Sequence, residues 1–171
     1  MLNNKDTITN RDVAQELLKR GIYEFQTGNY SNALAIINQA IEVKPNYYEA
    51  LIVRATLIYP IFGNHQGVIQ DCSQIIKINP HNQEAYNNRG YAFASIGGHL
   101  EAIKDYNRAL IIDSNSIYSY LNRGISYAHV EEYERAISDF NSVIQLDPQN
   151  ADAYNNRSLI FFFKRISKSD Y

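Results

Sequence analysis

The feature that most constrains this sequence is an internal repeat of about 34 residues. The segment 86–90, Tyr-Asn-Asn-Arg-Gly, recurs in closely similar form at 120–124 and at 154–158, each time after 34 residues. Towards the N-terminus, 51–55 and 17–21 fall in phase with it after one step of 35 residues and one of 34. A second set of positions keeps the same frame, with spacings of 35, 34 and 34: Pro45, Pro80, Ser114 and Pro148. Two independent sets of residues that share one frame and one single-residue insertion indicate a structural repeat.

The repeat divides the chain into a polar lead-in and one repeat domain. The lead-in is 1–13, the domain is 14–171, and its units are 14–47, 48–82, 83–116, 117–150 and a partial unit 151–171. Within a unit, residues such as Tyr86, Gly90 and Phe93 have the spacing of one face of a helix. A turn follows, and a second helix is predicted from about Leu100 to Ile112. Residues before a proline leave the helical region, so Pro80 and its equivalents end this second helix. The pattern predicts an all-α chain of helical hairpins, in which Thr9–Asp12 caps the first helix.

Charge and composition exclude several classes of function. The net charge is -2, without the clustered Lys and Arg that phosphate contacts need, so no nucleic-acid partner is expected. The single cysteine, Cys72, excludes an internal disulfide and a Cys-based zinc site. The most apolar run, 159–163, is far below the roughly 20 residues that span a bilayer. With no signal-peptide pattern at the N-terminus, we expect a cytoplasmic protein without membrane insertion. Because the sequence has no catalytic, cofactor or metal motif, we also expect no enzyme activity, cofactor or metal.

The landmark residues resemble the tetratricopeptide repeat family. They are Tyr86, Gly90, Phe93, Ala102, Tyr106 and Ala109 in the third unit, and Tyr120, Gly124, Tyr127, Ala136, Phe140 and Pro148 in the fourth. The first unit departs from the pattern at Glu24, and the second departs at Val68 and Ile75. The resemblance covers residues 14 to about 163. It implies a right-handed superhelical solenoid of hairpins, with four full repeats plus a terminal helix.

Small and charged residues recur at fixed places in the units. Gly21, Gly90 and Gly124 are expected to let two helices approach closely, with Ala33, Ala102 and Ala136 as the facing residues. An arginine recurs in all five units, at positions 20, 54, 89, 123 and 157, and an aspartate recurs in three, as Asp71, Asp105 and Asp139. We expect each aspartate to pair with an arginine of its own or the following hairpin. The alternative is a row of arginines that binds an acidic ligand.

The resemblance implies that a peptide lies along a concave groove lined by the first helix of each hairpin. The residue before each repeated arginine is expected to face this groove: Lys19, Val53, Asn88, Asn122 and Asn156. A carboxamide both donates and accepts hydrogen bonds, so the three asparagines, one per repeat, suit an extended peptide backbone. The alternative is that they are merely solvated. Asn87 and Asn155 flank this asparagine row, and Tyr91, Ile125 and Leu159 would supply shallow apolar pockets, with His129 further along. Glu49, Glu84 and Asp152 near the groove edge favour a neutral or mildly basic ligand.

Two irregularities interrupt the pattern. The extra residue of the second unit lies within 59–63, where we expect Pro60 to end the first helix early or to kink it. This segment is interpreted as a turn insertion, and the alternative is a change of superhelix pitch that separates the first two units from the rest. The second irregularity is the apolar stretch 159–166, from which Ile160, Phe162, Phe163 and Ile166 are expected to contact a second copy or a partner. The alternatives are a partly exposed helix or a truncated array.

These features predict a non-catalytic scaffold or adaptor that binds an extended peptide segment of a protein partner. Two other functions stay open: a self-associating structural protein that uses the C-terminal helix as its contact, and a secretion-type or assembly chaperone.

Overall fold

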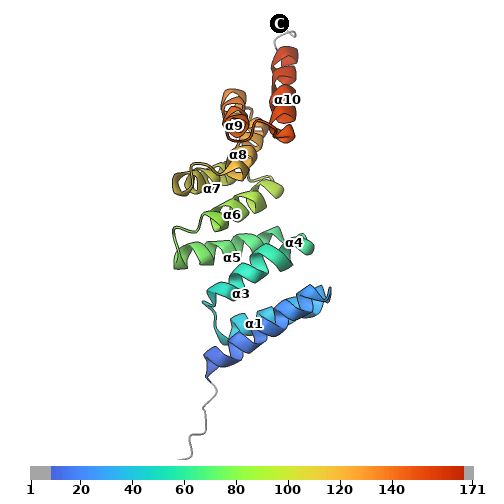
Figure 1. Cartoon of the computed structure of the whole chain (residues 1–171), viewed down its shortest axis with the longest axis vertical. Helices are drawn as coiled ribbons and strands as arrows, with labels where there is room; N and C mark the ends of the chain where they lie inside the picture. The colour runs from blue at the N-terminus through green and yellow to red at the C-terminus, as the bar shows by residue number, and fades with distance from the viewer. Residues whose placement is uncertain (1–8, 168–171) are drawn as a thin grey trace, which may run out of the picture. The chain divides into compact units, whose positions relative to one another are not determined.

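The computed structural model describes residues 9–167, apart from the side chains of 163 and 165–167. Every element in this part of the chain is a helix, which confirms the all-α prediction (Figure 1). The helices form two compact units, of which the first ends at Pro80 and the second begins at His81. This division falls between the second and third sequence repeats.

The first unit consists of two helical hairpins. Its helices are α1 (Asn10–Gln26), α2 (Tyr30–Val43), α3 (Tyr48–Val53), the π-helical turn η1 (Arg54–Ile58), α4 (Tyr59–Ile61) and α5 (His65–Ile78). A capping box begins α1, as the sequence predicted: Thr9 Oγ1 accepts from the Asp12 backbone N–H at 3.3 Å, and Asp12 Oδ2 accepts from the Thr9 N–H at 2.9 Å. The buried cluster includes Leu18, Ile37 and Ile58, and Cys72 is fully buried as a small apolar residue.

A π-helical turn takes up the extra residue of the second repeat. The backbone N–H of Tyr59 donates to the carbonyl of Arg54, five residues earlier, and the helix then continues through α4 to Ile61. The predictions of an early helix end at Pro60 and of an insertion in the turn were therefore wrong. A π turn adds one residue to a helix without ending it. The turn that follows keeps the form of its equivalent in the first repeat, since Gly63 and Gly28 both have positive φ.

The second unit contains two hairpins followed by one further helix. Its elements are α6 (Gln83–Ser95), α7 (His99–Ile112), α8 (Ile117–His129), α9 (Tyr133–Leu146) and α10 (Ala151–Ser167) (Figure 1). The predicted second helix, 100–112, is confirmed to within one residue. Asp147, which precedes a proline, has extended backbone angles and ends α9. Side chains from α7, α8, α9 and α10 form the buried cluster of this unit: Ile103, Tyr127, Ala136, Phe140 and Ile160.

The mid-helix glycines allow a large side chain of the same hairpin to approach. A Cβ atom on Gly124 would lie 2.7 Å from Phe140 Cε1, and one on Gly90 would lie 2.9 Å from Tyr106 Cε1. Close approach was predicted, and the atoms nearest to each missing Cβ belong to these large side chains, which fill the space that it leaves. At Gly21 the backbone oxygen of the predicted facing residue, Ala33, also lies 3.6 Å from the Cβ position.

Candidate functional site

The predicted asparagine row lies on the first helices of the second unit. Asn88, Asn122 and Asn156 are half-buried on α6, α8 and α10. Among residues 9–167, the carboxamides of Asn88 and Asn122 make no hydrogen bond, and Asn156 uses only its Nδ2, which donates to the Asp152 carbonyl at 2.8 Å. A half-buried carboxamide with unused donors and acceptors can bind the backbone of an extended peptide.

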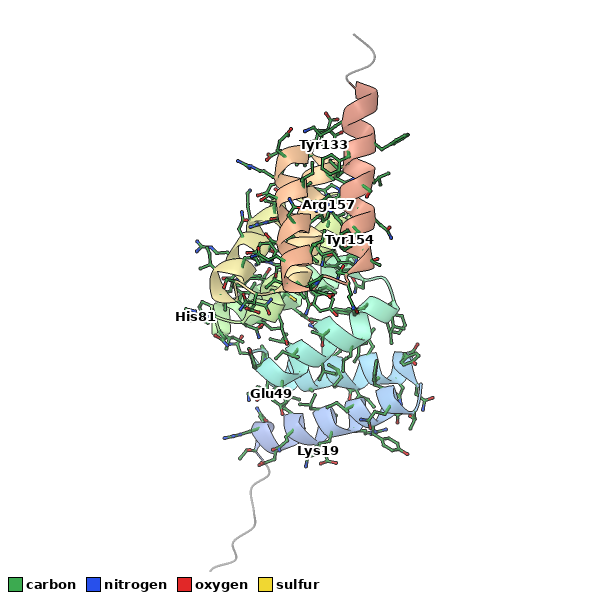
Figure 2. All side chains as sticks on the ribbon, turned by 45° about the horizontal axis from the view of Figure 1, so that its top comes forward. Lys19, Glu49, His81, Tyr133, Tyr154 and Arg157 are labelled. Atoms are coloured by element: carbon green, nitrogen blue, oxygen red, sulfur yellow. The ribbon has the colours of Figure 1, made fainter. Side chains whose placement is uncertain are left out.

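The other predicted groove residues are placed differently. Tyr91 is 57% exposed on α6, and Asn155 is exposed on α10. Lys19 is exposed on α1 in the first unit (Figure 2). Val53 is half-buried at the end of α3, and its side chain packs against the core of the first unit.

Asn87 takes part in the packing between α6 and α8. The Ser119 hydroxyl donates to Asn87 Oδ1 at 2.7 Å, and Gln83 Nε2 donates to Ser116 Oγ at 2.9 Å. Ser116 and Ser119 are buried. These bonds satisfy polar groups that would be costly to bury alone, so Asn87 joins two neighbouring hairpins.

A pocket of about 380 Å³ lies between α8, α9 and α10, and we call it the α8–α10 pocket. It is lined by Ile125, Ala128, His129, Glu131, Tyr133, Phe140, Asn156, Leu159 and Ile160. The structure thus brings four residues of the predicted groove, Asn156, Ile125, Leu159 and His129, to one place. Tyr133 and the helix α10, with Tyr154 and Arg157, can be followed in Figure 2. Asn122 and Tyr91 are not among the lining residues.

Glu131 has an uncommon backbone conformation at the edge of this pocket. Its φ is 61°, in the left-handed region, where Gly28, Gly63 and Gly97 stand at the corresponding turns of the first three repeats. Side chains with a Cβ disfavour this conformation. Sequence reasoning missed Glu131, although a glutamate that replaces a recurring turn glycine was a visible signal.

The carboxylate of Glu131 is also unpaired within the described part of the chain. Its two acidic neighbours are paired: Glu132 contacts Arg135 at 2.7 Å, and Glu134 contacts Lys164 at 2.5 Å. Glu131 is therefore the acid of this turn that is left available to a ligand.

Two histidines stack beside the pocket. The rings of His99, at the start of α7, and His129, at the end of α8, have centroids 4.2 Å apart and planes within 5°. His99 Nδ1 is buried without a hydrogen-bond partner among the described residues. Burial lowers the pKa of His99, and the nearby charge of His129 lowers this pKa further.

The repeated arginines bind the repeated aspartates, as predicted. Arg54 bonds both oxygens of Asp71 at 2.7 Å, and Arg123 bonds those of Asp139 at 2.8 and 2.7 Å. Arg89 and Asp105 make the same pair at 2.8 and 2.7 Å. Each pair lies within one hairpin, with its aspartate buried, and we call it an arginine clamp. The guanidiniums of Arg54, Arg89 and Arg123 are thus engaged by aspartates within their own hairpins, which counts against a row of arginines that binds an acidic ligand.

Three of the repeated arginines also bind asparagines that sequence reasoning missed. Nη1 of Arg54 donates to Asn38 Oδ1 at 2.6 Å, and Nη1 of Arg123 donates to Asn107 Oδ1 at 2.6 Å. Arg157 donates to Asn141 Oδ1 at 2.5 Å. Each asparagine belongs to the second helix of the preceding hairpin, so the arginine ties two hairpins together. Asn107 and Asn141 are 34 residues apart, a recurrence that the sequence already contained.

The predicted self-association residues on α10 divide into three groups. Ile160 is 4% exposed and packs with Tyr127 and Phe140, so its assignment to an exposed contact surface was wrong. Phe162 is 59% exposed. The side chains of Phe163 and Ile166 lie outside the described residues.

The helices of the described chain are too short or too polar to cross a membrane.

Comparisons with known proteins agree with this architecture. Sequence models of tetratricopeptide repeats match residues 98–160 and residues 17–47. A search of curated proteins gave no match. The structure resembles that of MamA protein with a TM-score of 0.86 at 20% identity, over 92% of this chain and 86% of that chain.

Two further similar structures concern the binding of peptides. YrrB is described as a TPR protein with an unusual peptide-binding site, and it matches with a TM-score of 0.76 at 17% identity, over 87% of this chain and 76% of that chain. The second TPR domain of human RPAP3, in complex with an HSP70 peptide, matches with a TM-score of 0.58 at 25% identity, over 60% of this chain and 85% of that chain. For MamA and YrrB, the likeness shows a shared fold.

Proposed function

Because the chain belongs to the tetratricopeptide repeat family, we propose that its second unit binds an extended peptide along α6, α8 and α10. In this proposal the protein is a non-catalytic scaffold or adaptor, and the peptide is a segment of a protein partner in the cytoplasm. Peptide complexes of related folds, such as the human RPAP3 domain with its HSP70 peptide, support this class of function.

The observation that carries the proposal is that the asparagine row has half-buried carboxamides with unused donors and acceptors. Asn88 and Asn122 are half-buried, yet within residues 9–167 their carboxamides make no hydrogen bond. Asn87 on α6, by contrast, accepts a hydrogen bond from the Ser119 hydroxyl of α8 at 2.7 Å. Polar groups kept half-buried and unbonded are suited to a ligand that supplies alternating N–H and C=O groups.

Selection from a random dodecapeptide library displayed on phage tests this proposal. Peptides selected on the whole protein should bind the Asn122→Ala, Asn156→Ala double variant at least tenfold more weakly, because two lost hydrogen bonds of about 1 kcal/mol each exceed that factor. Fluorescence anisotropy with the synthetic peptides measures the loss. The matched control is Asn10→Ala with Asn115→Ala, two exposed asparagines away from the row. Equal affinity of both double variants would refute the proposal.

A second candidate function, self-association, is favoured by one observation on α10. Phe161 and Phe162 are 54% and 59% exposed, and large exposed aromatic side chains often mark contact surfaces. Light scattering at tens of micromolar separates the two functions. A strictly monomeric mass removes self-association. An oligomer that the Phe161→Ser, Phe162→Ser double variant dissociates supports it, whereas the asparagine variants should leave the mass unchanged.

A further inference from the structure

We propose that the α8–α10 pocket receives a lysine or arginine side chain of the bound peptide, with the carboxylate of Glu131 as its counter-charge. This inference rests on the proposed function and adds to it the chemistry of one ligand side chain. Three observations carry it: the composition of the pocket, the conformation of Glu131 and the charges around it.

The walls of the pocket suit the stem of a long basic side chain. Ile125 and Ala128 on α8 and Leu159 on α10 supply apolar surface, and Asn156 of the asparagine row belongs to the same lining. Lysine and arginine bury their methylene groups against such surface while the charged end stays near water. A peptide backbone held at Asn156 would therefore have this pocket within reach of a side chain.

The left-handed conformation of Glu131 is better accounted for by a role in ligand binding than by a contribution to the stability of the fold. Three of the four turns between the helices of a hairpin have glycine at this place, and Glu131 adopts the same left-handed φ at a conformational cost. No interaction of its carboxylate offsets this cost within the described chain, because the carboxylate forms neither a hydrogen bond nor an ion pair there. Strained residues of this kind gather at ligand sites.

The charges of the site select a cation. Glu131 is the carboxylate among the lining residues, and that lining includes no lysine or arginine. Glu84 and Asp152 are exposed near the starts of α6 and α10, and they add negative charge on the helices that carry the asparagine row. An acidic side chain would be repelled here, and a purely apolar one would leave Glu131 unused.

Capped tripeptides Ac-Ala-X-Ala-NH₂ test the inference, with X as arginine, norleucine or glutamate. In ¹⁵N-correlated NMR spectra of the whole protein, the arginine peptide should shift the amides of Ala128, Glu131 and Leu159. It should bind about fivefold more tightly than the norleucine peptide at low salt, and the glutamate peptide should bind most weakly. Glu131→Gln should remove the preference for arginine. Glu42→Gln, the same change at an exposed site on α2, should keep it.

Glu131→Gly separates binding from folding. This variant should lose the preference for arginine while its melting temperature rises, because glycine adopts the left-handed conformation freely. A loss of binding therefore does not reflect unfolding. A melting temperature that falls would overturn the argument from strain.

The results distinguish this inference from the proposed function. If norleucine or glutamate binds as well as arginine, while library peptides still depend on Asn122 and Asn156, the inference fails and peptide binding stands. If arginine is preferred through Glu131 but no library peptide depends on the asparagines, the pocket stands and the extended-peptide proposal fails. If neither dependence is found, both are overturned.

Discussion

At the scale of single residues, the arginine clamps are two-pronged ion pairs with buried aspartates. The aspartates are 3–4% exposed, and an ionised carboxylate at such depth needs a partner. Burial raises the pKa of Asp139, and the hydrogen bonds and charge of Arg123 oppose that rise. The arginine also reaches Asn107 in the preceding hairpin, so one side chain holds both the hairpin and its neighbour.

Replacing Asp139 by Asn is expected to lower the free energy of unfolding by about 3 kcal/mol, because it leaves Arg123 half-buried without a counter-charge. Urea unfolding followed by circular dichroism measures the change. The control is Glu101→Gln, which removes one partner of the exposed Glu101–Lys104 pair and should change stability by less than about 0.5 kcal/mol. Similar effects of the two substitutions would contradict a structural role of the clamp.

At the scale of elements, the contact between the start of α7 and the end of α8 contains one histidine, His99, whose surroundings lower its pKa. His99 stacks on His129, and its Nδ1 is buried without a partner in the described chain. Its pKa is lowered in the folded state by burial and by His129, so the folded protein binds a proton there more weakly than the unfolded chain does.

The free energy of unfolding is therefore expected to fall as the pH drops below about 6.5, the usual pKa of histidine in an unfolded chain. Above that pH both states are unprotonated, and this histidine contributes no pH dependence. The loss continues until the folded-state pKa is reached. Urea unfolding at pH 7.5, 6 and 5 measures it.

His99→Gln should reduce this dependence on pH. His65→Gln, at the corresponding position of α5, is the control and should retain it. An identical pH profile for the protein and the His99 variant would show that the pKa of His99 is not lowered by folding.

At the scale of the whole molecule, the chain consists of two compact units. The second unit has its own buried cluster, which draws on α7, α8, α9 and α10. The asparagine row and the α8–α10 pocket both belong to this unit. The binding proposals therefore concern residues after His81.

A fragment of residues 81–171 is accordingly expected to fold by itself. It should show helical circular dichroism and a cooperative thermal transition, and it should bind the arginine tripeptide with the affinity of the whole protein. The fragment 1–80 is the comparison and should show no such binding. A fragment 81–171 without a cooperative transition would show that its core is insufficient.

The sequence predicted most features that recur, with the asparagines beside the arginines as the exception, and it missed features that depend on one position. The helices, the capping box and the clamps follow from periodicity, because a 34-residue repeat places equivalent residues in equivalent surroundings. Ile160 was assigned to an exposed surface because its neighbours are all apolar, and only the packing on Tyr127 and Phe140 shows which side of α10 is covered. The stacking of His99 on His129 joins residues 30 apart from different helices, and neither lies in a motif.

The π turn in the second repeat has a consequence for how such arrays tolerate change. The second repeat is one residue longer than the other full repeats, and the π turn takes up that residue within the five residues Arg54–Ile58. The following turn then has a glycine with positive φ, Gly63, as the first repeat has at Gly28. Insertions of this kind can thus accumulate in an array while the order of its hairpins is preserved. Residues 48–97, which contain the π turn, are matched by neither family model, although they form a hairpin and a helix of the same kind. A repeat count that allows one step of 35 residues therefore finds hairpins that those models do not match.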